Sequence, residues 1–198
     1  MIVIGLTGSI AMGKSETAKM FASLGVPVCH SDMIVHRLYE EGGAAVAAVA
    51  KAFPEAMEGG HVDRTRLAAM LSRHPERFGE LEAIVHPLVK KEQERFLDRC
   101  RRDGARMAVL DIPLLFESGH QRDVDRIVVV SAPAAMQKAR ALSRPGMTEE
   151  KLAQLLARQW PDEEKRKRAD FIVDSSQGLD HARRQVRDIV ARLTSESE

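Results

Sequence analysis

The sequence predicts an α/β fold in which helices cover both faces of a parallel sheet. Short runs rich in Val, Ile and Leu alternate with helical patterns, beginning with a strand at 2–6 and a helix at 14–24. Parallel strands are buried on both faces, so they read as continuous apolar runs instead of alternating ones. A Gly-rich loop joins the first strand to the first helix, at the edge where open sheets of this class bind ligands.

The remaining elements follow in a regular order. Strands are predicted at 26–29, 106–113, 126–133 and 169–176, and helices from about Met33 to Gly42, at 134–144, at 148–160 and after the last strand to about Leu193. Between 62 and 102 the pattern is helical and strongly charged, with interruptions at His74-Pro75 and His86-Pro87. We therefore expect an all-helical insertion in that stretch.

Composition excludes several classes of protein. The chain has 198 residues, enough for one core with one or two small insertions, and its 30 basic and 29 acidic side chains give a net charge of +1. This balance predicts no general attraction to nucleic acid or to a membrane. We find no apolar run long enough for a membrane span and no signal-peptide pattern, so a cytoplasmic protein is expected. Cys29 and Cys100 are interpreted as buried thiols.

The octet "GSIAMGKS" from Gly8 to Ser15 has the spacing of a P-loop, whose backbone N–H groups surround phosphate oxygens. Gly8 and Gly13 allow the backbone conformation and the close approach that this requires. Lys14 would meet the β- and γ-phosphates, and the Ser15 hydroxyl would complete the shell of a Mg²⁺ ion. A Gly-rich turn that matches by chance is the alternative. The predicted nucleotide-binding residues of this segment are Gly8, Ser9, Ile10, Ala11, Met12, Gly13, Lys14, Ser15 and Glu16.

The absence of asparagine argues against one class of P-loop protein, the GTPases. The chain contains no asparagine, so it lacks the Asn-Lys-x-Asp element with which GTPases read guanine. ATP-driven machines are usually longer, whereas a small core with helical insertions suits a kinase that closes over two substrates. A regulatory protein that only holds ATP is the alternative from a different class.

Several segments together resemble the dephospho-CoA kinase family. They are "IGLTGSIAMGKS", "HSDMIVHRLY", "LEAIVHPLV", "LDIPLLFE", "QKARALSRPGMTEEKLAQLLARQ" and "ADFIVDSS", in the family's order over nearly the whole chain. The resemblance implies a three-layer P-loop kinase core, a helical CoA-side domain and a small helical lid. It also implies ATP and dephospho-CoA as substrates, Mg²⁺ as cofactor, and phosphorylation of the ribose 3′-hydroxyl. We assign the core to 1–60, 104–133 and 168–198, the CoA-side domain to 61–103 and the lid to 134–167.

The acceptor side of the site is predicted around Asp32. Asp32 follows the second strand at the sheet edge that carries the P-loop, and it would act as the base for the acceptor hydroxyl. The family usually has Asp-Ala-Asp where this chain has His-Ser-Asp, which leaves a single carboxylate; a helix N-cap is the alternative role. Arg37 would face the acceptor phosphates or solvent. His86 would contact substrate or cap a kink in the helical insertion.

Asp111 ends the apolar run "MAVLD" at 107–111, the position of a Walker B acid that holds magnesium through water. A turn residue before Ile-Pro is the alternative. Leu114, Leu115 and Phe116 would line the acceptor pocket, although they most simply join the core. The charged run 162–168 is interpreted as a solvated helix end.

Arg140 and Arg144 are the predicted lid residues. They are four positions apart, so one predicted helix would present both to the same anion, the transferring phosphoryl group. Arg144 would lie nearer the lid tip and would act more on ATP affinity. An exposed basic face is the alternative. Ser175 stands where the family often has Asn, which leaves the residues that read adenine undetermined. Another small-molecule P-loop kinase, acting on a nucleoside or nucleotide, is the nearest alternative function. The sequence makes no prediction about protein partners.

Overall fold

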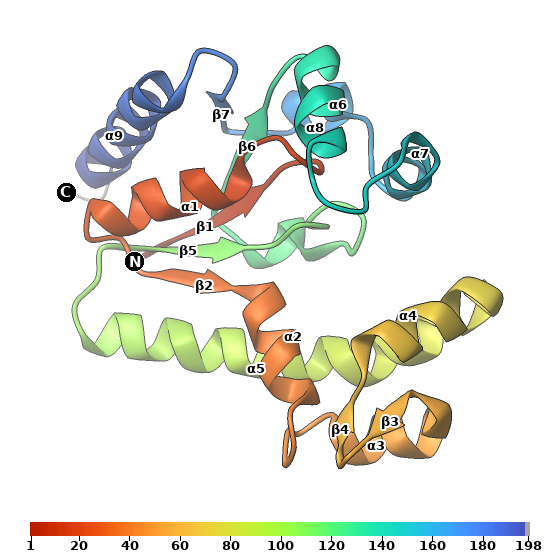
Figure 1. The fold of residues 1–198 in the computed structure, drawn as a ribbon. Coiled ribbons are helices and arrows are strands. Elements are labelled where there is room, and N and C mark those ends of the chain that lie inside the picture. The colour runs from red at the N-terminus through yellow and green to blue at the C-terminus, as the bar shows by residue number, and fades with distance from the viewer. Residues whose placement is uncertain (197–198) are drawn as a thin grey trace. The chain divides into compact units, whose positions relative to one another are not determined.

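The computed structural model describes residues 1–196, and the chain forms two compact units. The first unit comprises Met1–Cys29 and Arg99–Glu198, and the second comprises His30–Asp98 (Figure 1). The second unit begins well before the helical insertion predicted at 61–103, and the predicted lid at 134–167 belongs to the first unit. The roles assigned to the three predicted domains remain predictions.

A five-stranded sheet has the order β2-β5-β1-β6-β7. The strands are β1 Ile2–Thr7, β2 Val28–His30, β5 Met107–Asp111, β6 Arg126–Ser131 and β7 Phe171–Asp174. β1 pairs in parallel with both β5 and β6, and β6 pairs in parallel with β7. The predicted parallel sheet is confirmed. Because β5 and β6 flank β1, their carboxyl ends lie beside the loop that follows β1 (Figure 1).

The core of the first unit lies between the sheet and two helices, α1 (Lys14–Ser23) and α9 (Leu179–Ser195). Fully buried side chains from β1, β5, β6 and β7 pack there against α1 and α9, with Phe21 among the largest. Burying each such side chain contributes about 1.5–3 kcal/mol, so this layer fixes the strand ends that carry the P-loop.

The other helices of the first unit are α6 Ala134–Leu142, α7 Glu149–Ala157, α8 Asp162–Lys167 and the short η3 His120–Asp123. The run 162–168 was expected to be solvated, and this is wrong for Lys165, which is fully buried. Its ammonium lies 2.8 Å from the carboxylate of Glu117. A charge pattern along the sequence does not reveal such a partner, which lies in a distant loop.

The second unit is built from helices and one hairpin. Its elements are α2 Ser31–Tyr39, α3 Val46–Ala52, η1 Pro54–Ala56, β3 Met57–Glu58, β4 His61–Val62, α4 Arg64–Arg73, η2 Pro75–Arg77 and most of α5 Phe78–Arg102. Gly59 and Gly60, both with positive φ, turn the antiparallel β3–β4 hairpin, whose second strand overlaps the start of the insertion predicted to be all-helical. The Asp63 carboxylate caps α4 by accepting from the N–H groups of Thr65 and Arg66.

The predicted interruption at His74-Pro75 is confirmed, because α4 and α5 are separate helices there. The predicted interruption at His86-Pro87 is wrong, since Pro87 lies inside the 25-residue helix α5. Proline removes one hydrogen bond at a cost of about 3 kcal/mol, which buried residues such as Val85 and Leu97 offset. Within residues 1–196, no helix is both long and apolar enough to cross a membrane.

Candidate active site

The P-loop connects β1 to α1, and two glycines are required by its geometry. A Cβ on Gly8 would lie 2.6 Å from the carbonyl oxygen of Val130, a distance that side-chain carbons essentially never reach. Gly13 has φ +95° and forms the N-cap of α1, where the left-handed backbone favours glycine. The loop therefore approaches β6 closely and directs the start of α1 toward the carboxyl edge of the sheet, as a phosphate site needs.

Lys14 and Asp111 form an ion pair at this edge. The Lys14 ammonium donates a hydrogen bond to Asp111 Oδ1, and both side chains are largely buried. The pairing follows from topology, because Leu6 in β1 lies opposite Asp111 in β5. A lysine held by a neighbouring carboxylate is fixed in direction, so its charge stays beside the loop instead of extending into solvent.

Mg²⁺ fits the oxygen groups found here. Mg²⁺ usually keeps several waters and takes only one or two protein oxygens beside the phosphates. Asp111 supplies a carboxylate, and Ser15 supplies an exposed hydroxyl in the first turn of α1. Among residues 1–196, no group of three or more His, Cys, Asp or Glu side chains forms a metal cluster. The donor set therefore suits a hydrated magnesium ion held with phosphate.

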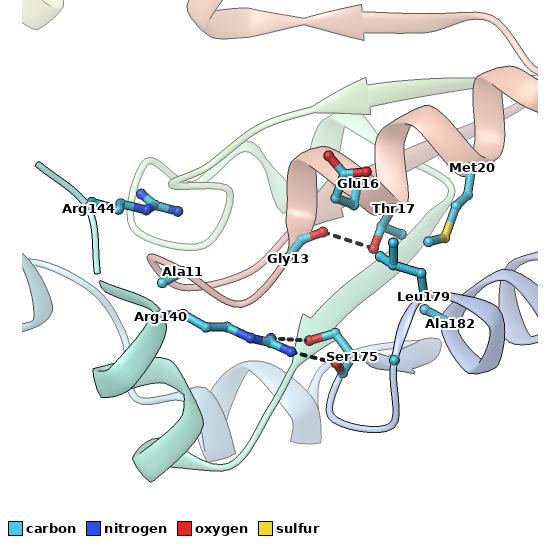
Figure 2. Close-up of a pocket in the computed structure, with 11 residues that line it drawn as sticks. Ala11, Gly13, Glu16, Thr17, Met20, Arg140, Arg144, Ser175, Leu179 and Ala182 are labelled. Atoms are coloured by element: carbon cyan, nitrogen blue, oxygen red, sulfur yellow. Dashed lines mark hydrogen bonds between the residues drawn. The ribbon is translucent and has the colours of Figure 1, made fainter. Parts of the chain in front are cut away.

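Arg140 in α6 is anchored at two points. Its guanidinium donates to Ser175 Oγ at 2.9 Å and to the Ser175 carbonyl oxygen at 2.8 Å (Figure 2). The Ser175 hydroxyl in turn donates to the carbonyl oxygen of Met12, at 2.7 Å. Because Ser175 connects the guanidinium to the P-loop backbone, the planar fork of Arg140 has a defined orientation.

Arg144 was predicted to share a helix with Arg140, and this is wrong. α6 ends at Leu142, so Arg144 lies on the segment after the helix (Figure 2). The Pro-Gly-Met sequence that follows breaks the helix earlier than the apolar pattern indicates. Both arginines nevertheless line one pocket beside the P-loop.

That pocket has a volume of about 320 Å³. Its walls come from the P-loop, α1, the two arginines, the loop after β7 and the start of α9 (Figure 2). The lining residues are Ala11, Gly13, Glu16, Thr17, Met20, Arg140, Arg144, Ser175, Gly178, Leu179 and Ala182. The loop that enters it is stabilised by Asp174, which accepts from the Ser176 N–H at 2.8 Å. Hydrogen bonds from the Ser176 side chain and backbone hold the pKa of the Asp174 carboxyl below its ordinary value.

Comparison with known proteins decides the family. The dephospho-CoA kinase family model matches residues 2–181. The dephospho-CoA kinase of Agrobacterium fabrum is 55% identical over 193 residues, which cover 98% of each chain. That of Mesorhizobium japonicum is 56% identical over 98% of this chain and 97% of its own. The chain belongs to the dephospho-CoA kinase family.

Solved structures agree with the family's fold. A crystal structure from Thermus thermophilus is 35% identical over 97% of each chain, with a TM-score of 0.85. A dephospho-CoA kinase from Campylobacter jejuni has a TM-score of 0.75 at 23% identity, covering 99% of this chain and 98% of its own, and supports the fold alone. The family membership and the P-loop kinase fold predicted from the sequence are confirmed.

Three of the predicted acceptor residues, Asp32, Arg37 and His86, belong to the second unit. Asp32 is exposed in the first turn of α2, but the N-cap of that helix is His30, with no side-chain capping bond. The capping alternative for Asp32 therefore loses its support. Arg37 is exposed on the same helix, and His86 is half-buried within α5. Their substrate contacts remain predictions.

The three side chains of the segment 114–116 differ in how far they are buried. Leu115 is fully buried and Phe116 almost so, whereas Leu114 is 41% exposed. Phe116 stacks on Trp160 with ring centroids 5.6 Å apart. Leu115 and Phe116 thus have the core role that the sequence analysis gives as the simpler one. Contact with the acceptor stays a prediction for all three residues, and Leu114 is the most accessible of them.

Sequence reasoning missed the partners of the predicted residues. Nothing in the sequence indicates that Ser175 holds Arg140, or that Lys14 pairs with Asp111. Glutamines 137 and 159, which contact the P-loop, were also missed. Polar side chains that bond backbone groups across more than a hundred residues leave no periodic signal. Knowledge of the strand order would have been needed to find them.

Proposed function

We propose that this chain transfers the γ-phosphoryl group of ATP to the ribose 3′-hydroxyl of dephospho-CoA, giving coenzyme A and ADP. The observation that carries the proposal is the P-loop with its paired Lys14 and Asp111, in a chain that matches dephospho-CoA kinases along its length. Catalysis in phosphoryl transfer is mainly positioning and charge stabilisation, which these groups supply.

On the nucleotide side, the P-loop N–H groups and Lys14 bind the ATP phosphates. The adjoining pocket accepts the rest of the nucleotide, with Met20, Leu179 and Ala182 as apolar contacts for the base. Arg140 and Arg144 also line this pocket and neutralise charge on the triphosphate. The Ser175 side chain is bonded to Arg140 and Met12, so it contributes to orientation more than to adenine recognition.

Magnesium is the implied cofactor. Ser15 and Asp111 would hold it, and it would neutralise charge on the β- and γ-phosphate oxygens. Mg²⁺ binding remains a proposal, as does a cytoplasmic location.

On the acceptor side, Asp32 receives the proton of the 3′-hydroxyl as its oxygen attacks the γ-phosphorus. The bond between that phosphorus and the β–γ bridging oxygen breaks, and ADP leaves. Asp32 is suited to this because its carboxylate is exposed and is not used for capping. Arg37, His86 and Leu114 contribute acceptor contacts.

An acceptor panel tests the proposal. ADP release is measured with Mg²⁺ and ATP, while dephospho-CoA, adenosine and AMP are offered separately. We expect release well above background with dephospho-CoA alone. Release should be lost in Lys14→Ala, which should still fold, although Asp111 loses its ion-pair partner and the melting temperature falls. Release with adenosine or AMP that equals or exceeds release with dephospho-CoA would favour a nucleoside or nucleotide kinase. Background release with all three would exclude catalysis on these acceptors.

A further inference from the structure

Two glutamine side chains contact one residue of the P-loop. The Ile10 N–H donates to Gln159 Oε1 at 3.1 Å, and Gln137 Nε2 donates to the Ile10 carbonyl oxygen at 2.9 Å. The partners determine how each amide is oriented, because a backbone N–H only donates and a carbonyl only accepts. Gln137 lies in α6, and Gln159 follows the end of α7.

These bonds fix two consecutive peptide planes. A peptide unit is planar, so holding the Ile10 carbonyl also sets the direction of the Ala11 N–H. Holding the Ile10 N–H likewise sets the Ser9 carbonyl, which accepts from the Met12 N–H within the loop at 3.2 Å. The orientation of N–H groups is the property by which a P-loop binds phosphate.

The next residue shows why such restraint is needed. Ala11 has φ +61°, the one non-glycine residue with positive φ among residues 1–196. An alanine stays in this sparsely populated region only when its surroundings hold it there. Ala11 is buried against Ala141 and Leu152, with Ile10 packed on the same cluster. The segment that carries the two glutamines thus contacts the loop through both apolar and polar groups.

We propose that Gln137 and Gln159, here called the glutamine bracket, are positioning residues that hold the P-loop in its phosphate-binding conformation. The inference rests on the proposed function only in taking ATP phosphates as the ligand of the loop. The two side chains have opposite roles: Gln137 must donate, and Gln159 must accept. Glutamate can replace an acceptor, but it cannot replace a donor while it is ionised.

Charge-matched variants exploit this difference. Gln137→Glu sets a carboxylate against the Ile10 carbonyl, whereas Gln159→Glu keeps an acceptor for the Ile10 N–H. Both add the same charge beside one residue, so the difference between them reports hydrogen-bond direction. We expect the dissociation constant of Mg·ATP, measured by calorimetry, to be about tenfold or more higher in Gln137→Glu than in Gln159→Glu, which is about 1.4 kcal/mol. Gln154→Glu, an exposed position on α7, is the matched control and should bind as the unmodified chain does.

Hydrogen exchange at the Ile10 amide gives a readout that does not need activity. We expect about tenfold faster exchange in Gln159→Leu than in the unmodified chain, and near-normal exchange in Gln159→Glu. This comparison of the two Gln159 variants also tests the glutamine bracket if Gln137→Glu does not fold. Equal Mg·ATP affinities for the two Glu variants, or Ile10 exchange unaffected by Gln159→Leu, would overturn the bracket while leaving the proposed function intact. If the unmodified chain does not bind Mg·ATP, the proposed function fails, and Ile10 exchange still decides whether the bracket holds the loop.

Discussion

Removing the charge of Glu117 should destabilise the first unit strongly. Lys165 is fully buried, and its ammonium lies 2.8 Å from Glu117 Oε1 without forming a well-directed hydrogen bond. Glu117→Gln keeps the shape of the side chain and an oxygen that can accept from the backbone N–H of Trp160, which donates to Glu117 Oε1 at 2.7 Å. What it loses is the negative charge that compensates the ammonium. Breaking a buried pair on one side costs about 3–5 kcal/mol, so the free energy of unfolding should fall by that amount.

The partner variants separate charge from packing. Lys165→Met removes the cation and leaves the Glu117 carboxylate, which is 11% exposed and still accepts a hydrogen bond from the backbone N–H of Trp160, so we expect a smaller loss. The double variant Glu117→Gln/Lys165→Met should recover most of the stability, because no uncompensated charge is left. Urea titrations followed by circular dichroism and by the fluorescence of Trp160, the single tryptophan, measure all three against the unmodified chain. A loss of less than about 1 kcal/mol in Glu117→Gln, or a double variant no more stable than it, would refute the reasoning.

Four further predictions concern the reacting groups and one thiol. Asp32→Asn should lower turnover with little change in ATP affinity, and a loss confined to thermal stability would contradict a role as base. Asp111→Asn should raise the magnesium concentration needed for half-maximal rate, so a magnesium titration identical to that of the unmodified chain would exclude a metal role. Arg140→Lys should lower turnover by about tenfold or more, since lysine cannot reproduce a two-point guanidinium contact; unchanged steady-state constants would support the basic-face alternative. Burial, followed by the charge of nearby Asp103, raises the pKa of the Cys100 thiol. Alkylation of Cys100 at neutral pH should therefore be slow until urea unfolds the chain, and rapid labelling of the folded protein would contradict this.

The elements that could be predicted from sequence are those with a local physical cause. Gly8 and Gly13 mark the P-loop because a Cβ would collide with β6 or strain the backbone. Asp111 could be placed at the sheet edge because parallel strands present their carboxyl ends together. Such constraints act within a few residues or follow from the regular geometry of a sheet.

The wrong predictions depended on contacts between distant parts of the chain. α5 continues through Pro87 because long-range packing offsets the lost hydrogen bond, and local propensity cannot weigh that. Lys165 reads as a surface charge until Glu117 is found beside it. The bonds that Gln137 and Gln159 make to Ile10 span more than a hundred residues, and their residue types alone give no indication of them.

The position of the transferred phosphate tests the central claim most directly. The chain is incubated with Mg²⁺, ATP and dephospho-CoA, and the product is analysed by phosphorus NMR and mass spectrometry beside a reaction with the 3′-deoxy analogue of the acceptor. We predict a product with one new monophosphate on the ribose 3′-oxygen, and no phosphorylation of the 3′-deoxy analogue. A phosphate on any other oxygen, or equal transfer to the 3′-deoxy analogue, would contradict the account.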